Sequence, residues 1–185
     1  MTTRYQLRKA TLEDPPALQA LIARSARGLS QGVYRPEQVE AALQGAFGVD
    51  TQLIHDGTYY VVEAQGAMVG CGGWSYRRTL FGSDARAGRD ATELDPQADA
   101  AKIRAFFVDP AHARRGIGTL LLEHCESQAR ARGFKRAELM GTLPGLMLYA
   151  ARGYRPLCNR VDHEVATGVT IEFVPMGKEF EGPAS

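Results

Sequence analysis

Residues 106–119 constrain the fold of this chain more than any other stretch. An apolar run ends at Val108 and is followed by Asp109-Pro110, and then by a turn that contains two arginines and two glycines. An amphipathic helical pattern starts directly after Gly116. Unpaired backbone N–H groups converge at a helix start, where the helix dipole adds partial positive charge. The stretch therefore predicts a strand, a turn and a helix, with a phosphate site at the turn.

The same turn excludes two common classes of phosphate-binding protein. The pattern G-x-x-x-x-G-K-[ST] of P-loop nucleotide hydrolases is absent from the chain. The dinucleotide-binding fingerprint also fails, because Gly116 and Gly118 are followed by Leu121 where the third glycine belongs. What remains is an R-R-G-x-G turn that follows V-D-P, in which backbone amides and two arginines can hold a pyrophosphate.

The other elements follow from hydrophobic periodicity and from glycine and proline. Strands are predicted at residues 5–9, 58–63, 67–76, 101–108 and 135–140, with two more in residues 154–178. Helices are predicted after Asp14 with Pro15 at the first helical position, from Pro36 to near Gly48, from Gly116 to Gly133, and over residues 144–151. Residues 77–101 show no usable period and are predicted to be a long surface loop. This order predicts one mixed α/β domain over residues 1–185.

Composition limits the partners and the compartment. Lysine and arginine total 22 and aspartate and glutamate 21, so the net charge of +1 argues against a protein that coats nucleic acid or an anionic membrane. The chain contains no apolar segment long enough for a signal peptide or a membrane span. The cysteines Cys71, Cys125 and Cys158 are odd in number and widely spaced, which favours reduced thiols in a cytoplasmic protein.

Two motifs in order resemble the GNAT superfamily of N-acetyltransferases. The first is the V-D-P strand with the R-R-G-x-G turn, and the second is L-Y-A-A-R-G-Y at residues 148–154. Residues 7–21 resemble the opening strand and helix of the family, so the resemblance covers most of the chain. Two departures stand out: Ala113 occupies a position where the family often has Gln or Arg, and the loop at residues 141–145 lacks the usual Asn.

The resemblance implies a GNAT-like α/β (α+β) fold with a mostly antiparallel central sheet of about six to seven strands flanked by helices. It also implies acetyl-CoA as co-substrate, no metal, and a small-molecule or peptide amine as acceptor; homodimers are common on this fold. The backbone of Phe106, Phe107 and Val108 would pair with the pantetheine arm like an added strand. The amides around the glycine turn would hold the pyrophosphate: Arg114, Arg115, Gly116, Ile117, Gly118 and Thr119.

Tyr149 is the catalytic candidate. It matches the family tyrosine that protonates the CoA sulfur, and a phenol can donate a proton at neutral pH. The developing oxyanion would be met by a main-chain N–H near Phe107 or Val108. No general base is assigned, because Glu63, Glu93 and Asp95 each also fit an ordinary solvated carboxylate. The first two helices and the loop at residues 77–101 are expected to shape the acceptor pocket.

These observations predict an acetyl-CoA-dependent N-acetyltransferase that works by direct attack of a primary amine in a ternary complex. The alternative is a non-catalytic acyl-CoA-binding or regulatory module on the same fold, which the missing base and the two departures leave open. A nucleic-acid-binding domain that uses Arg114 and Arg115 is disfavoured by the net charge of +1.

Overall fold

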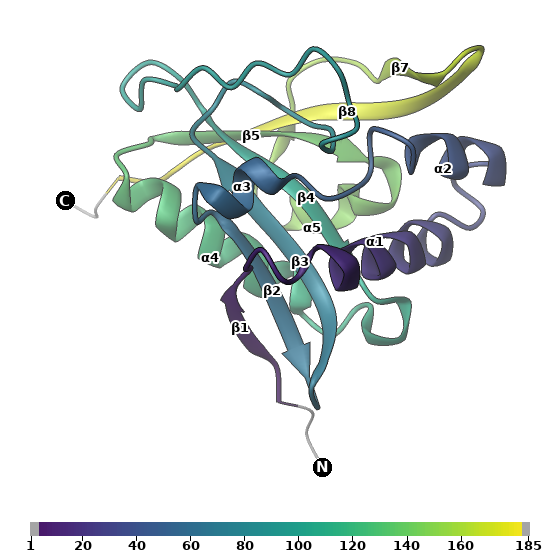
Figure 1. Cartoon of the computed structure of the whole chain (residues 1–185). Helices are drawn as coiled ribbons and strands as arrows, with labels where there is room; N and C mark the ends of the chain where they lie inside the picture. Colours follow the sequence, from purple (N-terminus) through teal and green to yellow (C-terminus); the bar gives the residue numbers. More distant parts are fainter. Residues whose placement is uncertain (1–3, 183–185) are drawn as a thin grey trace.

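The computed structural model describes residues 4–182. Within this range the centre is an eight-stranded sheet of order β1-β2-β3-β4-β5-β8-β6, with β7 paired to β8 beside that path (Figure 1). Every pairing is antiparallel except the one between β4 and β5. The predicted fold class is confirmed, and the strand beyond the expected six to seven is the two-residue β6.

The N-terminal half forms three strands and three helices on the first part of the sheet. The strands are β1 (Gln6–Lys9), β2 (Tyr59–Ala64) and β3 (Ala67–Ser75), and the helices are α1 (Pro15–Leu29), α2 (Pro36–Ala42) and α3 (Thr51–His55). Gln65 and Gly66 both have positive φ, as the tight turn between the right-twisted strands β2 and β3 requires. The predicted hairpin is therefore present.

The predicted N-cap of the first helix is confirmed in position, whereas the predicted end of the second helix needs correction. Asp14 stands at the N-cap of α1, but its carboxylate binds the Arg8 guanidinium at 2.9 Å instead of capping the helix. The second helix ends at Ala42, short of the predicted stop near Gly48, because Phe47 donates its N–H back to the Ala42 carbonyl and closes the helix end. The short helix α3 was not predicted.

The C-terminal half contains β4 (Ala101–Val108), the 3₁₀ turn η1 (Pro110–His112), α4 (Ile117–Ala131) and β5 (Arg136–Thr142). It continues with the 3₁₀ turn η2 (Leu143–Gly145), α5 (Leu146–Ala151), β6 (Arg155–Pro156), β7 (Val161–Ala166) and β8 (Val169–Glu179). Residues 77–100 form the predicted loop, with one isolated bridge between Arg77 and Glu93.

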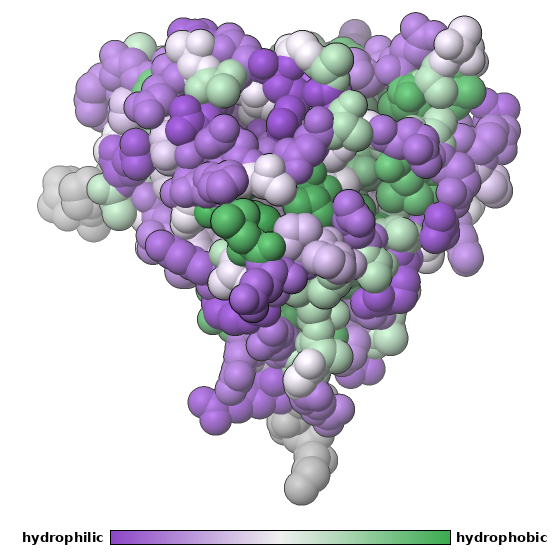
Figure 2. All heavy atoms as spheres, viewed as in Figure 1, coloured by the Kyte–Doolittle hydropathy of each residue, from purple (hydrophilic) through white to green (hydrophobic). Residues whose placement is uncertain are grey.

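Two apolar cores lie on opposite faces of the sheet. One is formed with α4 and α5 and includes Leu121 and Tyr149; the other is formed with α1, α2 and α3 and includes Leu18 and Phe47. The face turned to the viewer in Figure 2 is mostly hydrophilic, and its hydrophobic residues show as separate patches. No helix in residues 4–182 is long and apolar enough to cross a membrane.

Candidate functional site

The strands β4 and β5 separate soon after they meet. They pair only at Ala101 with Ala137 and at Lys102 with Glu138, and β5 then stays paired with β8 along its whole length. The edge of β4 beyond Lys102 therefore has no strand beside it on the β5 side. An open strand edge offers backbone N–H and C=O groups to an extended, amide-bearing ligand.

A bulge in β4 sets the direction of this open edge. The register with β3 shifts between Cys71 and Gly73, and Ala105 adopts φ 54 at the bulge. The Tyr59 hydroxyl holds the bulge by donating to the Ala105 carbonyl at 2.9 Å. Gly72 is required opposite the bulge, since a Cβ there would lie 2.4 Å from the Phe106 ring.

Alternation along β4 then divides its N–H groups between two edges. Asp109 donates to the Val69 carbonyl of β3, whereas Val108 donates to the Ser25 hydroxyl oxygen at 3.1 Å. The N–H of Phe107 therefore faces β3, and the N–H of Phe106 lies on the open edge with that of Val108. Of these two open-edge amides, that of Val108 is bonded to Ser25, and that of Phe106 is directed to the β4–β5 opening.

The glycine turn follows β4 and is held by its first residue. The Asp109 carboxylate accepts the Ala111 N–H at 2.9 Å and is paired with Arg24 of α1 at 3.0 Å. Gly116 is the N-cap of α4 and has φ 86, a conformation that favours glycine. Within residues 4–182 no side chain caps α4, so the N–H groups of its first turn remain available to an anion.

The open edge and the turn border one cavity of about 600 Å³. It is lined from the α4 and α5 side, from β4 between them, and from α1 and the segment after α2. The lining residues are Ser25, Ala26, Leu29, Ser30, Phe47, Phe106, Phe107, Val108, Ala113, Arg114, Gly116, Ile117, Gly118, Thr119, Thr142, Pro144, Gly145, Met147, Leu148, Tyr149 and Ala151. Phe106 lies near Tyr149 and Phe107 near Phe47, so the cavity reaches both faces of the sheet.

Tyr149 lies in this cavity at the middle of α5. Its side chain is buried, and its hydroxyl has no hydrogen-bond partner within residues 4–182. Burial raises its pKa well above the usual value, with a further contribution from Cys125, so the phenol stays protonated at neutral pH. Gly145 leaves room for the ring, since a Cβ there would lie 3.0 Å from it.

All but one of the predicted site residues line this cavity. Phe106, Phe107, Val108, Arg114, Gly116, Ile117, Gly118, Thr119 and Tyr149 do so; Arg115 is exposed and is not part of the lining. Sequence reasoning did not single out Ser25, Phe47 or Thr142. Ser25 and Phe47 lie in segments read only for helical periodicity, and Thr142 lies in the loop where an Asn was sought.

The carboxylates weighed as bases lie elsewhere. Glu63 is bound to Arg8 at 2.7 Å, Glu93 is largely exposed, and Asp95 accepts the Gln97 N–H in the long loop. None of the three lines the cavity, and the residues that the structure describes contain no group of three or more His, Cys, Asp or Glu that could hold a metal ion.

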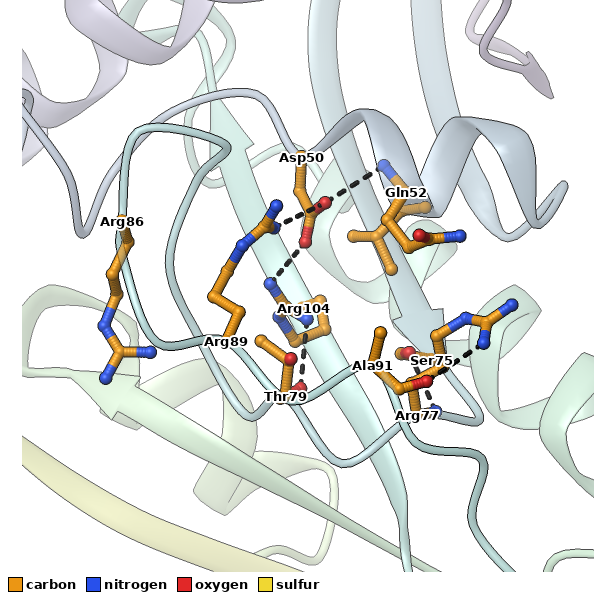
Figure 3. Close-up of a pocket in the computed structure, with 10 residues that line it drawn as sticks. Asp50, Gln52, Ser75, Arg77, Thr79, Arg86, Arg89, Ala91 and Arg104 are labelled. Carbon is orange, nitrogen blue, oxygen red and sulfur yellow. Dashed lines mark hydrogen bonds and ion pairs between the residues drawn. The ribbon is translucent and has the colours of Figure 1, made fainter.

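A second cavity of about 260 Å³ lies beside β4, next to the long loop and α3 (Figure 3). Arg77, Arg86, Arg89 and Arg104 line it. Figure 3 shows the guanidinium groups of Arg89 and Arg104 directed at the Asp50 carboxylate, at distances of 2.8 and 2.7 Å.

These arginines serve the protein itself. Arg104 is 3% exposed and also donates to the carbonyls of Thr79 and Gly82, which ties the loop to β4. Arg77 forms two hydrogen bonds with Asp56. The long loop, which was expected to shape the acceptor pocket, lines this second cavity, and none of its residues lines the larger one.

Comparison with known proteins identifies the family. Residues 24–154 match the model of the acetyltransferase (GNAT) family. A GCN5-related N-acetyltransferase from Rhodopseudomonas palustris superposes with a TM-score of 0.70 at 21% identity, over 97% of this chain and 99% of that one. A search of curated proteins found no match.

Two further structures share the fold. The PaiA N-acetyltransferase of Thermoplasma acidophilum, in complex with coenzyme A, gives a TM-score of 0.63 at 15% identity, over 96% of this chain and 99% of that one. The ribosomal-protein-S18-alanine N-acetyltransferase of Escherichia coli gives 0.60 at 17% identity, over 98% and 97%.

Proposed function

The chain belongs to the acetyltransferase (GNAT) family and is an acyltransferase with acetyl-CoA as donor, and from this premise we propose that it acetylates a primary amine of a small molecule or peptide. We propose direct attack by the amine in a ternary complex, within one acetyltransferase domain in the cytoplasm. The observation that carries the proposal is the opening between β4 and β5, which leads from the uncapped glycine turn to the Tyr149 hydroxyl.

The chain's own groups fit the donor. The first-turn N–H groups of α4 would bind the pyrophosphate, and hydrogen bonds to charged groups contribute about 1.5–3 kcal/mol each. The open edge of β4 would bind the amides of the pantetheine arm through the backbone carbonyls of Phe106 and Val108, which leaves the Phe106 N–H for the acetyl carbonyl oxygen. The Thr142 hydroxyl, which also borders the cavity, would supply the polar contact that the missing Asn would otherwise give.

The bound donor supplies an activated acetyl thioester. An amide N–C bond forms as the thioester C–S bond breaks, the amine loses a proton to cavity water, and the departing sulfur receives one. The Tyr149 hydroxyl would donate that proton and regain one from the same water, and the Phe106 N–H would stabilise negative charge on the carbonyl oxygen. Burial keeps Tyr149 in the protonated form that this role needs.

Tyr149→Phe tests the proposal. We expect kcat for thiol release to fall about 100-fold, because the proton donor is lost, while the Kd for acetyl-CoA stays the same. Tyr154→Phe is the matched control: Tyr154 packs 6.0 Å from Tyr149 in the same core but does not line the cavity.

One observation favours a second candidate, an acyl-CoA-binding or regulatory module without turnover. No aspartate, glutamate or histidine lines the cavity in the part of the chain that the structure describes. Binding of acetyl-CoA with no thiol release for any amine, and with no effect of Tyr149→Phe, would favour this module over the enzyme.

A further inference from the structure

The part of the cavity on the α1 side is the space left for the acceptor. This step rests on the proposed function, in which the donor occupies the β4 edge and the α4 turn. The remaining walls are Ser25, Ala26, Leu29 and Ser30 from α1 and its C-terminal end, with Phe47 and Phe107. These residues lie on the face of the sheet opposite α4 and α5.

This acceptor end carries no charge. Arg114 is the one charged residue among the cavity walls that the structure describes, and it belongs to the glycine turn at the other end. The charged residues of α1 nearest to the cavity are directed elsewhere: Arg24 is paired with Asp109 at 3.0 Å and Arg27 with Glu40 at 2.6 Å. A substrate charge placed between these walls would lose its water and meet no counter-ion, which is costly.

The walls fit an apolar body instead. The Phe47 ring is buried and meets the Phe107 ring edge-on, with centroids 5.8 Å apart, and Leu29 and Ala26 add aliphatic surface. Edge-on aromatic pairs accept further aromatic rings in the same way. The polar side chains at this end are the hydroxyls of Ser25 and Ser30, which can hydrogen-bond to an uncharged amine.

We propose that the acceptor is a primary amine carried on an uncharged aliphatic or aromatic body. The reacting nitrogen enters unprotonated, and the rest of the molecule packs against Phe47, Phe107 and Leu29. Amines that carry a second charge, either a carboxylate or another ammonium group, are poor acceptors because the walls hold no counter-ion for it.

Matched pairs of amines test this acceptor class in thiol-release assays with acetyl-CoA. 2-Phenylethylamine is compared with phenylalanine, which adds a carboxylate, and butylamine with 1,4-diaminobutane, which adds an ammonium group. We expect kcat/KM for the member with the extra charge to be lower by about 100-fold in each pair. Equal or higher kcat/KM for the charged members would overturn the inference while leaving the acetyltransferase proposal intact.

A charged variant of the wall should reverse the preference for the uncharged amine. Leu29→Asp places a carboxylate on the partly exposed wall and should raise the ratio of diaminobutane to butylamine turnover at least about tenfold. Leu29→Asn is the control of equal shape, and it should leave that ratio unchanged. An unchanged ratio in Leu29→Asp would contradict the assignment of this wall to the acceptor. If acetyl-CoA binds but neither uncharged amine releases thiol while another amine or a peptide does, the acceptor inference is wrong and the acetyltransferase stands. If no amine or peptide of any class releases thiol, the proposed function itself is wrong.

Discussion

The two cavities beside β4 use charge in opposite ways. The smaller one has four arginines in its walls, but Asp50, Asp56 and backbone carbonyls already bind all four of them. The larger one has one arginine, yet within residues 4–182 no side chain caps the first-turn N–H groups of α4, and the edge of β4 at Phe106 is open on the β5 side. Groups without partners therefore mark the site for an anionic ligand better than the number of charged side chains does.

The difference also separates stability from binding. Arg104 and Asp50 are both almost fully buried, so each depends on the other to offset the loss of hydration. The Gly116 turn is exposed to the larger cavity and holds no buried charge. Changes in the smaller cavity should alter the free energy of unfolding, and changes at the turn should alter the affinity for acetyl-CoA.

The largest effect is expected for Arg104→Met. The substitution leaves the buried Asp50 with the Arg89 ion pair and the Gln52 N–H, and it removes the contacts to Thr79 and Gly82. We expect the free energy of unfolding, measured by urea titration, to fall by about 3 kcal/mol. The double variant Asp50→Asn with Arg104→Met should lose less than the two single variants added together. An unchanged urea midpoint for Arg104→Met would show that the network does not hold the loop.

A smaller effect is expected for Arg114→Ala at the larger cavity. Arg114 is exposed, so its loss should leave the free energy of unfolding unchanged. The Kd for acetyl-CoA should rise about fivefold, because one charge beside the pyrophosphate is removed. Arg115→Ala is the comparison, since Arg115 lies outside the cavity walls, and its Kd should stay near that of the wild type. Equal Kd values for the two variants would contradict the claim that Arg114, and not Arg115, contacts the bound donor.

The smallest change is expected on the alkaline side of the pH profile. Burial raises the pKa of Tyr149, so its hydroxyl loses its proton at a higher pH than an ordinary tyrosine with a pKa of 10.0. With the neutral amine at a fixed concentration, kcat should therefore stay level between about pH 8 and pH 10. A fall in kcat within this window, absent from Tyr149→Phe, would mean that Tyr149 titrates as an exposed phenol.

The glycine turn could be predicted from the sequence because its determinants are adjacent. β4 has the predicted bounds, Asp109 begins the turn, and Gly116 is the N-cap of α4. Each of these depends on residues a few positions apart, so local patterns contain the information. That Tyr149 belongs to the same site was predicted from the family resemblance and not from a local pattern.

The acceptor end and the smaller cavity could not be predicted in the same way. Ser25 and Phe47 reach the cavity because α1 and the segment after α2 pack on β4. Helical periodicity in the sequence predicts which face of each helix is buried, but not which strand that face contacts. Arg104 and Asp50 are 54 positions apart, and neither lies in a motif. Pairings of this kind depend on tertiary packing, which a single sequence does not reveal.

Titration of acetyl-CoA into two glycine variants tests the account most directly. Gly116 and Gly168 both have positive φ with open space around the missing Cβ, but Gly168 lies in the turn between β7 and β8. Alanine at either position should cost about 1–2 kcal/mol of stability through backbone strain. We predict that calorimetry gives a Kd at least about tenfold higher for Gly116→Ala and an unchanged Kd for Gly168→Ala. Equal Kd values for both variants and the wild type would contradict donor binding at the glycine turn.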